Sequence, residues 1–280
     1  MEVMNIAKWV CESCSYYPPS STDGKPCAQC NPDDPFLNCY SEKLSGDDLD
    51  QMDIVYFVKD EPINEELRYS LRSVAKNFPH RNVWFYGGCP DDLQPDRWAY
   101  IKQNARSKWG NTSGLLRNAC ANEGISENFV LFNDDFFVMK PIESLPYYSD
   151  GSLEKRIKEL WTRNPGGSVY ITRMQLTKKM LTQEQFPTEN YAMHMPMIIN
   201  RREMQETFKK FPDGEMWRSL YGNHHRKPVE YMKDCKIYSR DEMPPTDTPF
   251  LSTTDASFLY GKVGEYIREI FPKPSRFEEV

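Results

Sequence analysis

The sequence lacks the features that would place it in several large functional classes. It has no run of 18 apolar residues, so we expect no membrane-spanning helix. Its first ten residues have no long apolar core of the kind that a signal peptide carries, and we therefore expect a cytoplasmic protein. It also has no excess of positive charge. The net charge of −6 argues against binding to nucleic acid by bulk charge, although it is compatible with a local basic patch.

Several catalytic motifs are missing as well. The chain contains no Walker A motif, no Gly-x-Ser-x-Gly, no His-Glu-x-x-His and no glycine fingerprint of a dinucleotide-binding fold. A serine hydrolase, a zinc protease or a simple dinucleotide enzyme therefore has no support. What is present is a globular composition, 39% hydrophobic over 280 residues, which suffices for one ordinary domain plus a small module.

Eight cysteines in a protein expected to be cytoplasmic need an explanation other than disulfides. Cys11-x2-Cys14 and Cys27-x2-Cys30 are two knuckles separated by twelve residues, and four thiolates suit a tetrahedral structural zinc site. The alternatives are an oxidised pair or unrelated free thiols. We assign this zinc-knuckle module to residues 1–45. The other cysteines are scattered and are expected to be ordinary buried residues: Cys39, Cys89, Cys120 and Cys235.

Residues 46–280 are predicted to form a second domain with an α/β fold. Three apolar runs at 53–58, 82–86 and 129–132 lack alternation, which is typical of strands that are buried on both faces of a parallel sheet. Segments with helical spacing lie between them, and Thr112 or Ser113 is the expected cap of the second one.

Beyond residue 150 the sequence pattern is less informative. The spacing predicts helices at 153–161 and 201–211. Residues 168–172 are predicted to form a strand, and the chain after Pro212 is predicted to be rich in loops.

The most informative stretch is Phe-Val-Leu-Phe-Asn-Asp-Asp-Phe-Phe at 129–137. Here Asn133, Asp134 and Asp135 interrupt an apolar run, and two adjacent carboxylates are unfavourable to bury unless a cation neutralises them. Carboxylates are hard oxygen ligands that hold Mg²⁺ or Mn²⁺ beside a phosphate. The pattern therefore suggests a metal–diphosphate site at a strand end. A helix N-cap or a turn is the alternative, because Asn and Asp favour both.

The ends of the three predicted strands meet at one edge of the sheet, where open α/β sheets bind ligands. They bring Lys59 and Asp60, then Gly87 and Gly88, next to the acidic pair. Glycines let a backbone approach a ligand closely, and a lysine reaches a phosphate. This combination suits a nucleotide diphosphate, with a metal as Lewis acid on the leaving group.

Other candidate residues have a structural alternative beside the functional one. Arg68 and Arg72 share a helix face and suit a phosphate, or pair with nearby glutamates on a solvated face; Arg117 invites the same caution. His194 lies among apolar residues and suits a core side chain. His224-His225 fits a surface loop or an acceptor contact. Asp255 fits a general base or a helix cap.

In sequence, the blocks Asp-Ile-Val-Tyr-Phe-Val (53–58), Glu-Leu-Arg-Tyr-Ser-Leu-Arg-Ser-Val (66–74), 129–136 and His194-Met-Pro196 resemble successive blocks of the Stealth family. These are sugar-phosphate transferases of capsule synthesis, related to the lysosomal N-acetylglucosamine-1-phosphotransferase. The chain resembles still more closely a set of short actinobacteriophage proteins described as glycosyltransferases. The matching stretches there include 111–113, 218–223, 251–258 and 267–272.

The resemblance implies a GT-A-like (Rossmann-like) nucleotide-sugar transferase fold, with Mg²⁺ or Mn²⁺ at Asp134 and Asp135. It implies substrate contacts from Arg68, Arg72, Asn111 and His194. The chain departs from Stealth at Lys59-Asp60, where that family usually has an Asp-Gly turn, and it is shorter; both differences favour glycosyl transfer. The full set of expected donor-binding residues is Val55, Tyr56, Asp60, Arg68, Arg72, Asn111, Arg117 and Asn133.

The function expected from these features is metal-dependent transfer of a sugar from a nucleotide-sugar donor, by a phage-encoded enzyme acting on a DNA base or a virion protein. Asp255 or His194 is the expected general base toward the acceptor, with Asp135 at the metal. Two alternatives stay open. One is transfer of a sugar 1-phosphate, as in Stealth proteins. The other is a zinc-dependent nucleic-acid- or protein-binding module with an inactive transferase body, supported by the locally basic segment 201–227.

Overall fold

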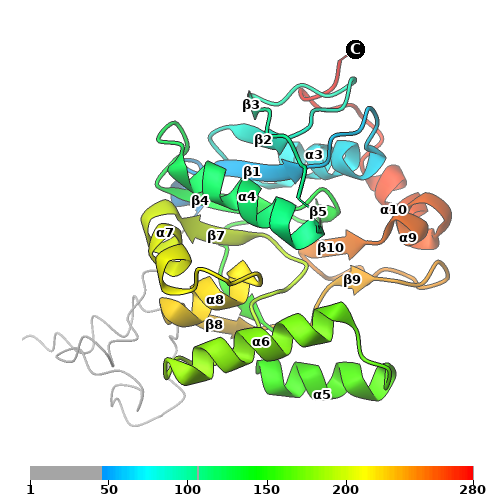
Figure 1. Cartoon of the computed structure of the whole chain (residues 1–280). Helices are drawn as coiled ribbons and strands as arrows, with labels where there is room; N and C mark the ends of the chain where they lie inside the picture. Colours follow the sequence, from blue (N-terminus) through cyan, green and yellow to red (C-terminus); the bar gives the residue numbers. More distant parts are fainter. Residues whose placement is uncertain (1–45, 106, 280) are drawn as a thin grey trace, which may run out of the picture.

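The computed structural model describes residues 46–105 and 107–279 (Figure 1). The predicted zinc-knuckle module, with Cys11, Cys14, Cys27 and Cys30, lies outside the described residues, so structural zinc and the domain boundary near residue 45 stay predictions. Within residues 46–105 and 107–279, every helix is too short or too polar to cross a membrane.

The central element is a mixed five-stranded sheet in the order β3-β2-β1-β4-β7. Strands β1, β2, β3 and β4 are mutually parallel, and β7 runs antiparallel to β4 at one edge. The predicted α/β class and the three predicted strands are therefore confirmed. The strands are β1 (Asp53–Val58), β2 (Val83–Gly87), β3 (Arg97–Ala99), β4 (Asn128–Phe132) and β7 (Met197–Asn200).

Alternate residues of β1 point into two separate cores. Tyr56 packs in a core with Leu71 of α3 (Glu65–Asn77), whereas Val55 packs in another core with Leu115 of α4 (Lys108–Ala121). The two helices thus cover opposite faces of the sheet. Because both faces are buried, β1 is apolar at every position after Asp53, which explains why its sequence shows no alternation.

Helix α4 begins earlier than predicted. Ser107 is its N-cap and accepts a hydrogen bond from the backbone N–H of Gly110, so Thr112 and Ser113 lie inside the helix. Two small sheets lie beyond the central one. The first has the order β5-β10-β9, and the second pairs β6 with β8. Their strands are β5 (Phe136–Val138), β6 (Tyr147–Ser149), β8 (Val229–Tyr231), β9 (Lys236–Ile237) and β10 (Phe250–Thr253).

The second half of the chain is more helical than predicted. The strand predicted at 168–172 is wrong, because Ser168 caps α6 by accepting a hydrogen bond from the N–H of Ile171. The chain after Pro212 is rich in loops as predicted, although it also contains α8, α9 and α10. The remaining helices are α2 (Gly46–Leu49), α5 (Leu153–Arg163), α6 (Val169–Gln183), α7 (Arg201–Lys210), α8 (Trp217–His224), α9 (Asp255–Tyr260) and α10 (Lys262–Ile270).

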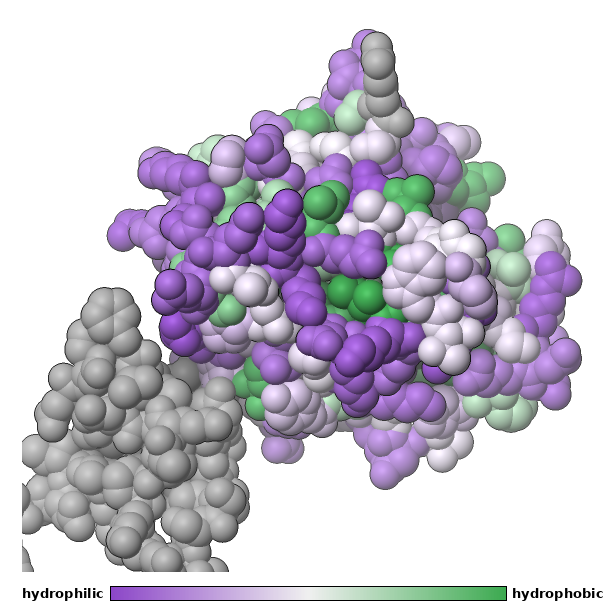
Figure 2. Space-filling model, turned by 60° about the horizontal axis from the view of Figure 1, so that its bottom comes forward, coloured by the Kyte–Doolittle hydropathy of each residue, from purple (hydrophilic) through white to green (hydrophobic). Residues whose placement is uncertain are grey.

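These elements leave the carboxyl ends of β1, β2 and β4 side by side, with β5 and β10 close to the end of β4 (Figure 1). Helices α5 and α6 pack together at the opposite end of the view from α3. The face turned forward in Figure 2 is mostly hydrophilic, with hydrophobic residues visible in a small hollow near its centre and at scattered places around its edge.

Candidate active site

The acidic pair lies in the turn between β4 and β5. The backbone N–H of Phe136 donates to the carbonyl of Asn133 at 3.3 Å, which closes the turn. Phe132 and Phe136, on either side, are fully buried, so the turn is anchored in the core while Asp134 and Asp135 remain partly accessible. The turn alternative and the ligand-site alternative are therefore compatible, because a turn at the end of a strand presents both carboxylates.

Asp135 has one satisfied oxygen and one that is not. Its Oδ2 accepts hydrogen bonds from Nζ of Lys236 at 2.6 Å and from Oγ of Ser252 at 3.1 Å. Its Oδ1 is buried and has no hydrogen-bond partner among the described residues. An orphaned, buried carboxylate oxygen is unfavourable unless a cation or another donor meets it.

Asp134 is held from the other side. Nδ2 of Asn64, the N-cap of α3, donates to Oδ2 of Asp134 at 2.9 Å. Burial and the neighbouring charge of Asp135 raise the pKa of the Asp134 carboxyl above its usual range. Both causes disfavour the charged form of Asp134, and a bound cation would favour it.

Glu66 adds a third carboxylate, whose place in the sequence indicates only the first turn of a helix. Burial raises its pKa to about 7, and the charges of Asp135, Asp134 and Asp255 contribute, against a hydrogen bond that Thr253 donates to its Oε1 at 2.6 Å. Asp255 is exposed and begins α9, whereas Thr254 is the N-cap. The helix-cap alternative for Asp255 is therefore wrong, while its role as a base stays a prediction.

These carboxylates do not form a complete protein cage for a metal. Within the described part of the chain, no group of three or more His, Cys, Asp or Glu side chains is arranged to hold a metal ion. Mg²⁺, however, is usually bound through one or two carboxylates, with water and substrate phosphates filling the other positions. The orphaned Oδ1 of Asp135 beside Asp134 fits that kind of open site.

Two cations stand against the acidic turn, and neither was predicted. Burial alone would lower the pKa of Lys236, but the charge of Asp135 and their hydrogen bond raise it above its usual range. Arg218, on α8, donates to the backbone carbonyls of Met195 and Leu131 and lies over the ring of Phe136. Burial lowers the pKa of Arg218 to about 10, against the nearby charges of Asp135 and Asp234.

His194 is held by a carboxylate. Its Nδ1 lies 2.7 Å from Oδ2 of Asp234, and its backbone N–H donates to Oδ1 of the same residue at 3.0 Å. Burial alone would raise the pKa of Asp234, but the hydrogen bonds and charge of His194 lower it below its usual range. A carboxylate beside Nδ1 fixes the orientation of the ring and favours the tautomer with the proton on Nδ1. Nε2 is then the nitrogen that can accept a proton. His194 is therefore an oriented side chain, not simply a core residue.

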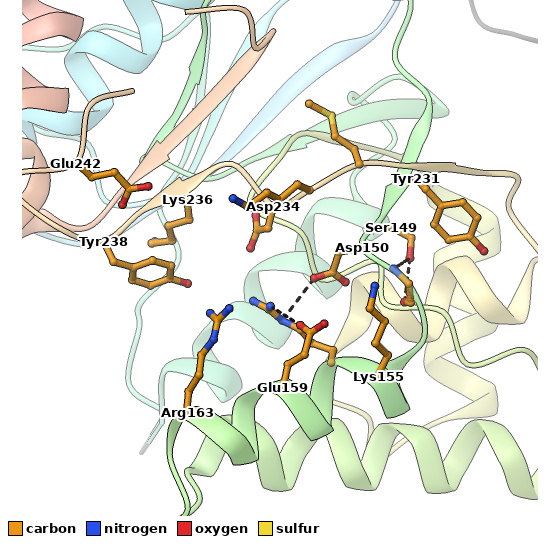
Figure 3. Close-up of a pocket in the computed structure, with 14 residues that line it drawn as sticks. Ser149, Asp150, Lys155, Glu159, Arg163, Tyr231, Asp234, Lys236, Tyr238 and Glu242 are labelled. Carbon is orange, nitrogen blue, oxygen red and sulfur yellow. Dashed lines mark hydrogen bonds and ion pairs between the residues drawn. The ribbon is translucent and has the colours of Figure 1, made fainter. Parts of the chain in front are cut away.

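A cavity of about 770 Å³ lies beside this site, between α5 and the β8–β9 segment (Figure 3). Asp234 and Lys236 form part of its wall. Because Lys236 also contacts Asp135, the cavity and the acidic turn share a side chain. Further side chains that line the cavity are those of Lys155, Arg163, Tyr231, Lys233, Tyr238 and Glu242.

Apart from the arginines, the expected donor-binding residues lie on the strands, at their ends or on α4. At the strand ends, Asn133 lies in the acidic turn and Asp60 accepts a hydrogen bond from Tyr100 at 3.2 Å. In the first turns of α4, Oδ1 of Asn111 accepts a hydrogen bond from the N–H of Ala105. Val55 and Tyr56, by contrast, are fully buried, so neither side chain is open to a ligand.

Three expected arginines are engaged in other contacts. Arg68 forms ion pairs with Asp92 and Glu278, and Arg72 donates to both oxygens of Glu278. Their expected helical partners, Glu65 and Glu66, are therefore not their ion-pair partners here. Arg117 lies over the rings of Phe208 and Trp217. Donor binding by these three stays a prediction.

Two other expectations concern histidines and cysteines. His224 and His225 do not form a surface loop: both are half-buried at the end of α8, within 3.1 Å of Oγ1 of Thr207. Burial lowers the pKa of both imidazoles. Cys120 and Cys235 are buried as expected, whereas Cys89 is only partly buried.

No protein-family model matches the chain, and no curated protein matches it. Among solved structures, the galactosyltransferase LgtC in complex with donor and acceptor sugar analogs matches 81% of this chain and 98% of its own, at 13% identity and TM-score 0.43. GlyE of Streptococcus pneumoniae TIGR4, a glycosyltransferase, matches 65% of this chain and 45% of its own, at 9% identity and TM-score 0.34. Mouse xyloside xylosyltransferase 1 matches 81% of this chain and 96% of its own, at 10% identity and TM-score 0.29. Likeness at this level assigns no activity, so the site itself must support one.

Proposed function

We propose that the chain is a metal-dependent glycosyltransferase with a GT-A-like fold, which moves a sugar from a nucleotide-sugar donor to an acceptor. The main support is the pair Asp134–Asp135 at the carboxyl end of β4 in the central sheet, with one oxygen of Asp135 buried and unpartnered among the described residues. Open α/β sheets bind ligands at this edge, and a diphosphate needs a cation there.

Asp134 and Asp135 would hold the divalent cation. When bound, Mg²⁺ or Mn²⁺ would offset the charge that develops on the diphosphate leaving group. Sites of this kind usually have one or two carboxylate ligands from the protein, while substrate phosphates and water supply the other ligands. Asn64 orients Asp134, and Ser252 orients Asp135, so both carboxylates are fixed before a ligand arrives.

The remaining residues fit the other requirements of the reaction. Lys236 and Arg218 place positive charge beside Asp135, where they offset part of the charge of the acidic turn. His194, oriented by Asp234, would take a proton from the acceptor hydroxyl, and the exposed Asp255 is the second candidate for that role. Asp60, Asn111 and Asn133 are the expected donor contacts.

Donor hydrolysis tests this proposal. The purified chain is incubated with a panel of nucleotide sugars and Mn²⁺ or Mg²⁺, and the released nucleotide is identified. We expect release of a nucleoside diphosphate that is lost in Asp135→Asn and kept in Asp241→Asn, a matched change at an exposed position. Release of a monophosphate instead would favour transfer of a sugar 1-phosphate, as the Stealth resemblance allows.

No release with any donor, even after DNA, protein and oligosaccharide acceptors are added, would contradict the proposal. The binding-module alternative would then be preferred. The relation to phage glycosyltransferases and the structural zinc are separate proposals. The zinc is tested by measuring one equivalent of bound zinc in the purified chain and its loss when Cys11 and Cys14 are replaced by serine.

A further inference from the structure

The cavity beside the acidic turn has two opposed walls. Figure 3 shows Lys155, Glu159 and Arg163 rising from α5 on one side, with Asp234 and Lys236 on the other. A volume of about 770 Å³ falls within the range of sites for small molecules and short oligomers, roughly 300–1,000 Å³. The cavity can therefore take a ligand of a few sugar-sized units.

A ligand in this cavity would sit next to the proposed reaction centre. Lys236 forms part of the cavity wall, and its Nζ lies 2.6 Å from Oδ2 of Asp135. Asp234 also lines the cavity, and it holds the imidazole of His194. The cavity wall thus includes one residue that contacts the proposed metal site and one that orients the proposed base. The diphosphate of the donor is expected at the acidic turn itself, so the substrate in the adjoining cavity, near the proposed base, would be the acceptor.

The charges of the cavity are nearly balanced. Five cationic side chains and four carboxylates line it, and some are already paired: Arg156 lies 3.4 Å from Asp150 and 3.3 Å from Glu159. DNA binding depends on several uncompensated cations that contact phosphates. Three of the cations here, Lys155, Arg163 and Lys233, make no ion pair with a described residue, but the four carboxylates in the same wall oppose the approach of phosphates. Sugar hydroxyls, which both donate and accept hydrogen bonds, are instead satisfied by carboxylates and cations together.

Aromatic side chains flank the cavity. Tyr231 and Tyr238 are 69% and 60% exposed, and Figure 3 shows them at opposite ends of it. An exposed tyrosine presents a flat apolar face and a polar tip. Such a face packs against the C–H groups of a sugar ring, while charged groups meet the hydroxyls at its edge. Lys155, Arg163, Lys233 and Glu242 make no side-chain hydrogen bond or ion pair within the described part of the chain, so they are available for that purpose.

We infer that this cavity is the acceptor subsite and that the acceptor is a neutral oligosaccharide rather than DNA. This inference rests on the proposed function, which leaves the acceptor open. The wall favours a neutral oligosaccharide because it combines nearly balanced charge with two exposed tyrosines.

Oligosaccharide binding tests the inference. Saturation-transfer NMR and calorimetry would use neutral gluco-, galacto-, manno- and N-acetylglucosamine oligomers of two to four units. We expect at least one to bind, with affinity reduced about fivefold to tenfold in Tyr231→Ala and in Tyr238→Ala. Tyr260→Ala, at an equally exposed tyrosine outside the cavity, is the matched control and should leave the affinity unchanged.

Three outcomes would overturn the inference: no oligomer binds, binding survives both cavity variants, or a short DNA duplex binds with a steep salt dependence that the cavity variants weaken. Donor hydrolysis by the wild-type chain is measured separately. Hydrolysis without oligosaccharide binding would overturn this inference alone. Binding in the cavity without hydrolysis of any donor would instead contradict the proposed function while leaving a carbohydrate site.

Discussion

Nζ of Lys236 lies 2.6 Å from Oδ2 of Asp135, while the other oxygen of that carboxylate is buried with no partner within the described residues. The lysine comes from β9 and the aspartate from the turn after β4, so two separate sheets meet at this contact. The positive charge of Lys236 offsets one of the two carboxylate charges of the acidic turn, and Oδ1 of Asp135 remains for a cation. The affinity of the turn for a metal should therefore depend on this lysine.

Replacing Lys236 by methionine should strengthen binding of Mn²⁺. Removing a positive charge next to Asp135 makes the local potential more negative, and we expect the affinity for Mn²⁺ to rise about tenfold. Electron paramagnetic resonance of free Mn²⁺ measures this affinity. Lys233→Met, on the same cavity wall but without an ion pair to a described residue, is the control. Equal affinities in all three proteins would show that Lys236 does not modulate a metal at Asp135.

Replacing Asp234 by asparagine should impair the proposed base without unfolding the chain. Asparagine keeps the shape of the side chain but removes the charge that orients and stabilises the imidazole of His194. We expect kcat to fall by about 100-fold, with a small change in KM for the donor. An unaltered kcat would mean that the contact between Asp234 and His194 is not used in the reaction. Asp241→Asn, the same change at an exposed position that does not line the cavity, is the control.

Gly87 should not tolerate a side chain. Its φ is +109°, and a Cβ there would lie 2.2 Å from the carbonyl oxygen of Val58. We expect Gly87→Ala to lower the free energy of unfolding by about 2 kcal/mol. A Cβ at Gly114, inside α4, would meet no atom within 4 Å, so Gly114→Ala should be neutral or stabilising by up to about 1 kcal/mol. Urea unfolding of both variants checks the pair; equal destabilisation would contradict the difference expected between the two glycines.

Protonation of the Asp53 carboxylate should account for part of the stability that the protein loses at acid pH. This carboxylate is fully buried and accepts from Arg81, Asn82 and Trp84 side chains and from the N–H of Ser126. Burial alone would raise its pKa, but these hydrogen bonds, led by Arg81, lower the pKa below its usual 3.8. The stabilisation is therefore fully present above about pH 4 and is lost as the pH falls through the folded-state pKa.

Asp53→Asn should accordingly lower the free energy of unfolding at neutral pH by about 2 kcal/mol, because the buried amide cannot accept all the hydrogen bonds that the carboxylate accepts. The difference from the wild type should shrink as the pH falls below about 4. Chemical denaturation at a series of pH values measures both effects, and Asp91→Asn, at an exposed site, is the control. A difference that stays constant down to low pH would contradict the assigned pKa direction.

The central sheet could be predicted because its signal is local. Strand β1 is buried on both faces, so its apolar run is continuous, and the Asn-Asp-Asp turn after β4 interrupts such a run visibly. The strand predicted at 168–172 failed for an equally local reason. Its β-branched and aromatic residues favour a strand, but the hydrogen bond from Ile171 to the side chain of Ser168 begins a helix there.

The rest of the site could not be predicted because its contacts are long-range. Lys236 and Asp135 are 101 positions apart, and Arg218 contacts the carbonyl of Leu131 from 87 positions away. Lys236 lies in no sequence pattern, and Arg218 lies in the matching stretch 218–223 and the basic segment 201–227, neither of which indicates a contact with β4. Arg68 and Arg72 show the converse: their helical spacing was visible, but not that Glu278, near the C-terminal end, would pair with both.

The position of a bound metal would decide whether the acidic turn is the catalytic centre. Crystals grown with Mn²⁺ and a nucleoside diphosphate would be measured at the manganese absorption edge. We predict an anomalous peak at bonding distance, roughly 2 Å, from carboxylate oxygens of Asp134 and Asp135, with diphosphate oxygens completing the site. A peak elsewhere, or a bound diphosphate with no manganese at this turn, would contradict a metal-dependent transferase centred on these two aspartates.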